Sequence, residues 1–161
     1  TWIWLPAAAI IALAVWFFVF HDKETDSSGR QTKERTNHSP TLQTVEGLLW
    51  ESPLGSCVYS GTVLTDDETG EQIPDGKGVA KILGGDYGGS TYDGEFHRGS
   101  FEGKTIYTFR NGDTFEGTFD NNEYDTGKYT VKESGEYFEG KFKNGKPDAG
   151  SWYDRNGNKI E

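Results

Sequence analysis

The sequence has little of what most catalytic and metal sites are built from. Its 161 residues include one cysteine, three histidines and no methionine. Cys57 cannot form an internal disulfide and has no neighbours that mark a nucleophile, so we expect a small buried side chain. His21, His38 and His97 are scattered, and no Cys/His pair has metal-ligand spacing. No phosphate-binding glycine loop lies between a strand and a helix. The sequence therefore predicts no enzyme, no cofactor and no metal.

Two alternatives to that prediction remain open. The acidic segments 66–68 and 120–125 offer oxygen ligands for Ca²⁺, although neither has the twelve-residue loop pattern, and both are typical of solvated turns. An active site within residues 64–90 would need a concave pocket and a carboxylate with a strongly displaced pKa. Paired carboxylates such as Asp93 and Glu95 lie on an expected exposed strand face, where no such displacement arises.

Positive charge is also in short supply. The net charge is −10, and the segment from Tyr59 onward has 20 acidic and 12 basic residues, a net of −8. An acidic surface repels phosphates, which excludes nucleic acid as a partner and weighs against anionic lipid head groups.

Long apolar runs are missing except at the start of the chain. Residues 2–20 contain no charge. As a helix these 19 residues would span roughly 28 Å, enough to cross a bilayer core. A signal peptide, the alternative, would have a basic leading region and a shorter apolar core. The absence of methionine indicates that the initiator was removed or that residues precede Thr1. The aromatic residues expected at the two membrane interfaces are Trp2, Trp4, Trp16, Phe17 and Phe18.

Residues 21–41 follow as a polar segment that cannot bury enough apolar surface to fold by itself, so we expect a flexible linker. It carries Lys23, Arg30, Lys33 and Arg35. Basic residues beside a membrane helix favour the cytoplasmic side, so we expect the rest of the chain there.

In the remainder of the chain one short sequence motif recurs at a fixed interval. An aromatic residue, a glycine and a second aromatic residue alternate with polar residues, and the central glycines Gly94, Gly117 and Gly140 are 23 residues apart. A fixed period of this length indicates an array of stacked units. A degenerate earlier copy surrounds Gly61, with a ten-residue surplus expected at 64–74 or 84–90. The residues that define the repeats are Tyr59, Gly61, Gly78, Tyr92, Gly94, Phe96, Phe115, Gly117, Phe119, Gly127, Phe138, Gly140, Phe142 and Gly150.

Each unit is predicted to be a β-hairpin. Alternation with period two places the rings on one face of a strand and the acidic residues on the other. Each glycine leaves a notch in which a ring of the neighbouring repeat can lie. Tight turns are expected at 97–99, 121–122 and 144–145, because Asn and Gly tolerate positive φ. The fold class is therefore mainly β, an elongated antiparallel sheet of hairpins preceded by one transmembrane helix.

These motifs resemble the MORN repeat family, whose unit is a hairpin beginning Tyr-x-Gly-x-aromatic. The resemblance covers residues 59–161 and implies units at about 59–91, 92–114, 115–137 and 138–160. It is weaker in the second strands, where Thr105 and Asp125 replace glycines. Residues 42–58 contain no copy of the repeat, so we expect a helical or extended cap on the first hairpin or a docking segment for another subunit.

The sequence thus predicts a single-pass membrane protein that serves as a protein-binding accessory or scaffold subunit of a larger membrane complex. A tether that contacts lipid and links two membranes, or a membrane and the cytoskeleton, is the alternative. Aromatic residues are enriched at protein interfaces. The candidate contact residues, which are also candidates for the core, are Tyr107, Tyr129, Trp152 and Tyr153.

Overall fold

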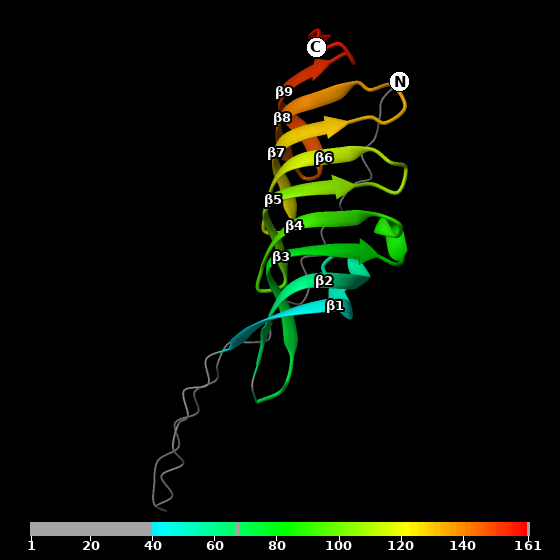
Figure 1. The fold of residues 1–161 in the computed structure, drawn as a ribbon. Helices are drawn as coiled ribbons and strands as arrows, with labels where there is room; N and C mark the ends of the chain where they lie inside the picture. The colour runs from blue at the N-terminus through cyan, green and yellow to red at the C-terminus, as the bar shows by residue number, and fades with distance from the viewer. Residues whose placement is uncertain (1–39, 67, 161) are drawn as a thin grey trace, which may run out of the picture.

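The computed structural model describes residues 40–66 and 68–160, and within them the chain forms one nine-stranded antiparallel sheet. The strands lie in sequence order, so that each pairs with the next, as Figure 1 shows. This confirms the predicted antiparallel sheet of hairpins. The strands are β1 (Thr41–Ser52), β2 (Gly55–Thr65), β3 (Gln72–Ile82), β4 (Thr91–His97), β5 (Ser100–Thr108), β6 (Thr114–Asp120), β7 (Glu123–Thr130), β8 (Tyr137–Lys143) and β9 (Lys146–Tyr153).

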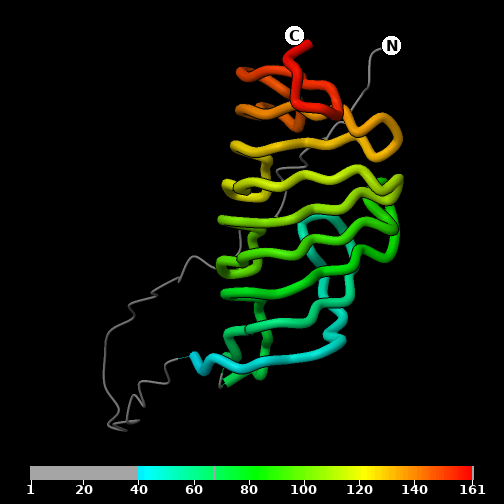
Figure 2. The backbone as a smooth tube through the Cα atoms, turned by 45° about the horizontal axis from the view of Figure 1, so that its top comes forward, coloured from blue at the N-terminus to red at the C-terminus, as the bar shows by residue number. Residues whose placement is uncertain are grey.

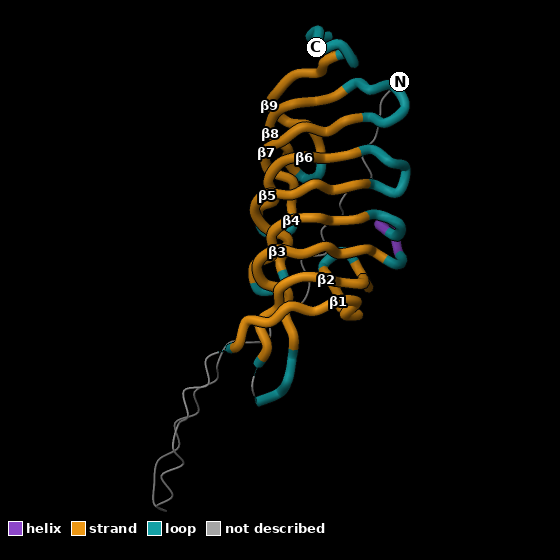
Figure 3. The backbone as a smooth tube through the Cα atoms, in the orientation of Figure 1, coloured by secondary structure: helices purple, strands orange, loops and turns teal. Residues whose placement is uncertain are grey.

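The only helix in the described part of the chain is η1 (Gly85–Tyr87), a single 3₁₀ turn between β3 and β4 (Figure 3). It accounts for part of the ten-residue surplus of the first repeat. The rest lies in the β2–β3 hairpin, whose strands have 11 residues each, whereas β8 and β9 have 7 and 8. The surplus is therefore divided between the two positions that the sequence offered as alternatives.

Residues 42–58 form most of β1, a turn and the beginning of β2. Of the two expected forms of a cap, the extended one is correct, because β1 pairs antiparallel with β2 and adds a strand to the sheet. The predicted membrane helix and nearly all of the predicted linker lie outside the described residues.

A column of small residues crosses the sheet at the same height in eight strands. Each member pairs with the next in antiparallel register. No side chain fits at Gly127, since a Cβ atom there would lie 2.5 Å from the Glu116 carbonyl oxygen. A register shift close to this column interrupts β2, β4, β6 and β8. We call this set the glycine column, and its members are Gly61, Gly78, Gly94, Thr105, Gly117, Gly127, Gly140 and Gly150.

The glycine column is where the sheet bends. β-bulges and glycines allow strands to turn sharply, and Figure 2 shows the strands turning back along one side of the ladder. The two rings of one strand then face each other across the bend. In β4 the centroids of Tyr92 and Phe96 lie 5.0 Å apart, edge to face. In β8 the centroids of Phe138 and Phe142 lie 5.2 Å apart.

Rings from both sides of the bend form one continuous core. Each edge-to-face pair contributes about 0.5–1.5 kcal/mol beyond the area it buries. Trp50 of β1 completes the core at one end and lies 6.0 Å from the rings of Tyr59, Phe96 and Phe101. The buried rings are Tyr59, Tyr92, Phe96, Phe101, Tyr107, Phe109, Phe115, Phe119, Tyr129, Phe138 and Phe142.

The expected notch at each glycine exists, but the predicted source of the ring that fills it was wrong. The ring of Phe115 lies against Gly117 and Gly127, and the ring of Phe138 lies against Gly150. In both cases ring and glycine belong to the same unit. At Gly94 the Thr105 side chain lies in this position, and among the described residues no ring of a neighbouring repeat lies against any of these glycines.

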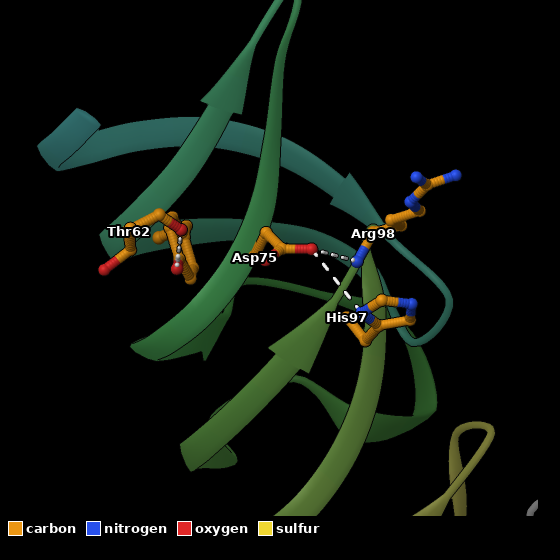
Figure 4. A network of polar contacts seen from close by, with 5 residues as sticks. Thr62, Asp75, His97 and Arg98 are labelled. Carbon is orange, nitrogen blue, oxygen red and sulfur yellow. Dashed lines mark hydrogen bonds and ion pairs between the residues drawn. The ribbon is translucent and has the colours of Figure 1, made fainter. Parts of the chain in front are cut away.

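The predicted tight turns are confirmed. Arg98, Asn121, Asn122 and Asn144 all have positive φ, between 46° and 71°. Two of the turns are also bonded to the preceding unit. The Arg98 amide donates to Asp75 Oδ2 at 3.0 Å, as Figure 4 shows, and the Asn121 amide donates to Glu102 Oε2 at 2.9 Å.

Candidate protein-binding face

The two faces of the sheet differ in what covers them. Side chains alternate between faces along a strand, and the inner face carries the ring core. Within the described residues no second layer covers the opposite face, which we call the outer face. Any ligand that the sheet binds through side chains meets this face first.

A row of carboxylates crosses the outer face. Asp93 on β4, Glu116 on β6 and Glu139 on β8 are all exposed, and each directly precedes a glycine of the column. Ile106 pairs with both Asp93 and Glu116, and Lys128 pairs with both Glu116 and Glu139. These five residues, the acidic row, therefore lie side by side on consecutive strands. Neighbouring strands are roughly 4.8 Å apart, so successive carboxylates are about 10 Å apart.

The three carboxylates make no hydrogen bond or ion pair within the described part of the chain. Lys128, which stands between two of them, directs its ammonium group over the Tyr137 ring, 4.0 Å from the centroid. A cation–π contact at an exposed site stabilises by roughly 0.5–1 kcal/mol. The carboxylates consequently remain available to an external cation.

A second row, two residues from the acidic row on the side away from the glycine column, is uncharged. Its side chains pair across the strands in unbroken register. It ends in Tyr137 and Tyr153, whose rings stack with centroids 5.0 Å apart. We call it the threonine row, after its first four members, and it comprises Thr91, Thr108, Thr114, Thr130, Tyr137 and Tyr153.

The outer face is hollowed around Ile106. A shallow open hollow of about 570 Å³ includes Asp93, Ile106 and Glu116 in its lining, with Lys77 and Lys104 also on it. The Ile106 side chain is 50% exposed although it lies within a strand. The hollow thus offers an apolar contact between two carboxylates.

The described residues with raised pKa values belong mainly to the inner face. Burial raises the pKa of Cys57 to about 11 and the pKa values of Tyr59 and Tyr107 to about 12. All three side chains are fully enclosed. They remain protonated near neutral pH and act as packing groups. Within the described residues no group of His, Cys, Asp and Glu is arranged to hold a metal ion.

The MORN repeat family model matches residues 92–114 and 138–148. These two segments of the chain match the MORN repeat. The first match coincides with one complete predicted unit, from β4 to the loop before β6, and the second begins where the fourth predicted unit begins. A search of curated proteins found no match to the chain.

The structure places the residues predicted to define the repeats in two sets. The aromatic residues are buried in the core, and the glycines lie in the glycine column at the bend. The replacement of a column glycine by Thr105 is accommodated by a hydrogen bond from its hydroxyl to the Asp93 carbonyl oxygen at 3.0 Å.

The four candidate contact residues separate into two groups. Tyr107 and Tyr129 are 0% and 3% exposed, so their prediction as contact residues was wrong and they belong to the core. Both lie on the inner face because the second strand of a unit continues the alternation of the first. Trp152 is half-buried against Phe138, with the ring centroids 5.7 Å apart. Tyr153 is half-buried on the outer face, at the end of the threonine row.

The predicted membrane-interface residues Trp2, Trp4, Trp16, Phe17 and Phe18 lie outside the described residues. Residues 40–66 and 68–160 include no helix with the length and apolar character of a membrane span.

Sequence reasoning missed Ile106 and the regularity of the acidic row. The signal for the row was present, because the residue between the first ring and the glycine is acidic in all three copies of the motif. The position of Ile106 between two of these acids depends on the register of β5 against both neighbours, which the sequence does not display.

Proposed function

We propose that this chain is a membrane-anchored, protein-binding scaffold or accessory subunit, and that the outer face of its MORN-repeat sheet is the contact surface. One observation carries the proposal: a broad sheet face with an exposed apolar residue and carboxylates that have no partner in the described residues. Isolated exposed charges are common on protein surfaces. Three carboxylates aligned on alternate strands, with one lysine between two of them, are less common, because they add self-repulsion that binding of a cationic partner would relieve.

The anchor in this proposal is the apolar run at residues 2–20, and the basic residues of the linker favour a cytoplasmic sheet. Protease treatment of sealed vesicles tests this orientation. Cleavage of the linker in vesicles whose cytoplasmic face is outside supports it, and protection until detergent is added contradicts it.

Copurification of the full chain from solubilised native membranes tests the scaffold function. The variant Asp93→Asn/Glu116→Gln/Glu139→Gln removes the row's carboxylates. The control Glu68→Gln/Glu71→Gln/Asp120→Asn changes the charge equally at exposed positions away from the row, two in the β2–β3 loop and one at the end of β6. We expect a stoichiometric partner to be retained by the control and lost by the variant. Recovery of the chain alone in every case would overturn the proposal.

The rival function, a lipid-contacting tether, is favoured by a different observation. Leu42, Leu49 and Leu83 are 62%, 74% and 57% exposed toward the β1 end of the sheet. Sedimentation of the chain with phosphatidylcholine vesicles, reduced by Leu42→Ser/Leu49→Ser and unchanged by the row variant, would support the tether in place of the scaffold.

A further inference from the structure

We infer that the acidic row is a docking site for an amphipathic α-helix of a partner protein, with basic residues at heptad spacing along one side of that helix. This inference rests on the proposed function and names the kind of partner that the outer face accepts. It follows from the spacing, the sequence and the surroundings of the row.

The spacing of the row fits a helix better than an extended peptide. Carboxylates on every second strand are about 10 Å apart, because neighbouring strands are roughly 4.8 Å apart. Helical residues i and i+7 lie on one side of the helix and are about 10.5 Å apart at 1.5 Å per residue. Same-face residues of an extended chain are roughly 6.6 Å or 13 Å apart, so they cannot meet two neighbouring carboxylates, and residues about 20 Å apart reach only the first and the third. Basic residues at i, i+7 and i+14 therefore meet Asp93, Glu116 and Glu139 in turn.

The two residues between the carboxylates specify the positions between the cations. Ile106 lies midway between Asp93 and Glu116, opposite residue i+3 or i+4 of the helix, so an apolar side chain is favoured there. Lys128 lies midway between Glu116 and Glu139, opposite residue i+10 or i+11, where a cation is repelled and an acidic residue is favoured. The row thus defines both the direction and the register of the helix.

The surroundings of the row leave room for this partner. The threonine row carries short uncharged side chains on four consecutive strands, so nothing tall stands beside the helix on that side. On the other side Lys104 lies near Ile106, where it favours an acidic or uncharged residue of the helix. At its far end, the stacked rings of Tyr137 and Tyr153 offer an apolar contact to residues beyond i+14. The hollow around Ile106 receives the apolar side chain between the first two cations.

The test uses the full chain in detergent and a fluorescein-labelled, alanine-rich 18-residue peptide with Lys at positions 1, 8 and 15, Leu at 5 and Glu at 12. A comparison peptide has the same composition with its lysines distributed around the helix. Fluorescence anisotropy at low salt measures both affinities. We expect the registered peptide to bind about tenfold or more tightly than the comparison peptide, since three charge pairs form together on one face. Equal affinities would overturn the inference.

Variants of the chain test the register itself. We expect Asp93→Asn/Glu116→Gln/Glu139→Gln to abolish the preference for the registered peptide and Glu68→Gln/Glu71→Gln/Asp120→Asn to leave it intact. Ile106→Thr keeps a β-branched side chain, and it should weaken binding of the Leu5 peptide but not of its Leu5→Ser derivative. Independent effects of the two changes would contradict contact between Ile106 and position 5. A partner that copurifies through the row while the peptides bind alike would remove this inference and leave the proposed function standing.

Discussion

The two halves of the sheet are built from the same repeat, yet they are held together differently. In the first half, β1 to β5, Trp50 covers the ring core and carboxylates of one unit bond the turn of the next. In the second half, β6 to β9, no carboxylate within the described residues bonds the corresponding Asn144 amide. Register explains the difference. Phe101 is separated from Thr105 in the column by three residues, whereas Tyr124 is separated from Gly127 by only two. The second strand of this unit is therefore one residue shorter, although Asp125 still supplies a carboxylate directly after Tyr124.

Strand pairing, ring packing and the bend therefore suffice to stack the units, and side-chain hydrogen bonds to the turns are additions. Asp125 illustrates this, because its carboxylate accepts from the Thr118 hydroxyl within its own hairpin at 3.1 Å. The outer face differs as well. Its first strands expose leucines, whereas the following strands carry the acidic row. The predictions below test whether the halves differ in stability as their contacts indicate.

The largest effect is expected from the two tryptophans that lie against opposite ends of the core. Trp50→Ala removes contacts with three rings and should cost about 3 kcal/mol of unfolding free energy. Trp152→Ala removes a contact with one ring and should cost roughly half as much. Urea unfolding of the two variants measures both values. A larger loss of unfolding free energy for Trp152→Ala than for Trp50→Ala would show that Trp50 is not the more important contact at the ends of the core.

A smaller effect distinguishes two equivalent tyrosines. The Tyr129 hydroxyl donates to the buried carboxylate of Asp113, which also accepts from the Lys132 amide at 2.9 Å. Tyr129→Phe leaves that carboxylate short of a donor and should cost about 1–3 kcal/mol. The Tyr107 hydroxyl is buried and has no hydrogen-bond partner among the described residues, so Tyr107→Phe should be neutral or slightly stabilising.

Thermal and urea unfolding of the two phenylalanine variants provide the measurement, and each serves as the control for the other. Equal destabilisation by both changes would show that the two hydroxyls have equivalent environments, against the structure.

The turn carboxylates should have a modest and local effect. Asp75→Asn and Glu102→Gln weaken charge-assisted bonds to turn amides and should each cost about 0.5–1.5 kcal/mol. The ion pair between Asp75 and His97 adds little, because the His97 side chain is 70% exposed. Hydrogen exchange should accelerate at Arg98 and Asn121 respectively. Asp125→Asn is the control in the second half, and acceleration at Asn144 in that variant would contradict the assignment.

The smallest effect is a pH dependence at the end of the second half. Hydrogen bonds from the Asn158 side chain and backbone lower the pKa of Asp154 below its usual value of 3.8. The folded state therefore binds this proton less readily than the unfolded state, so Asp154 stabilises above pH 3.8, and its contribution is lost as the pH falls through the lowered pKa. NMR titration of loop amides 156–158 should show loosening only below pH 3.8. Loosening that begins near neutral pH would exclude Asp154 as its cause.

Much of the fold could be predicted from the sequence because the repeated motif contains the signals for strands, turns and stacking. Alternation of rings and acids gives strands, the Asn and Gly pairs give turns, and the interval of 23 residues gives the stacking. The bend could not be predicted. It results from eight small residues coming into register. One of these positions is held by Thr105, so the glycine pattern is incomplete in the sequence. The extra strand β1 was equally hidden, since residues 42–58 carry no repeat and their pairing with β2 depends on long-range contacts.

The candidate site was predicted in character but not in detail. An acidic, exposed strand face followed from the alternation, whereas Tyr107 and Tyr129 were assigned a contact role that burial excludes. A tyrosine is apolar over most of its surface and polar at one atom, so sequence alone does not distinguish a core ring from a contact ring. In the first strand of each unit, the acidic residue between ring and glycine indicates which face is exposed. The second strands have no such residue.

Site-specific photo-crosslinking in native membranes tests the central claim, binding of a protein by the outer face, most directly. A benzoylphenylalanine at Ile106 or at Thr108 lies on the outer face, and one at Glu68 lies on the β2–β3 loop. The account predicts a discrete protein adduct at Ile106 and Thr108, lost when Glu116→Gln and Glu139→Gln are added, and none at Glu68. Adducts to lipid alone, or the same protein adduct from all three positions, would contradict it.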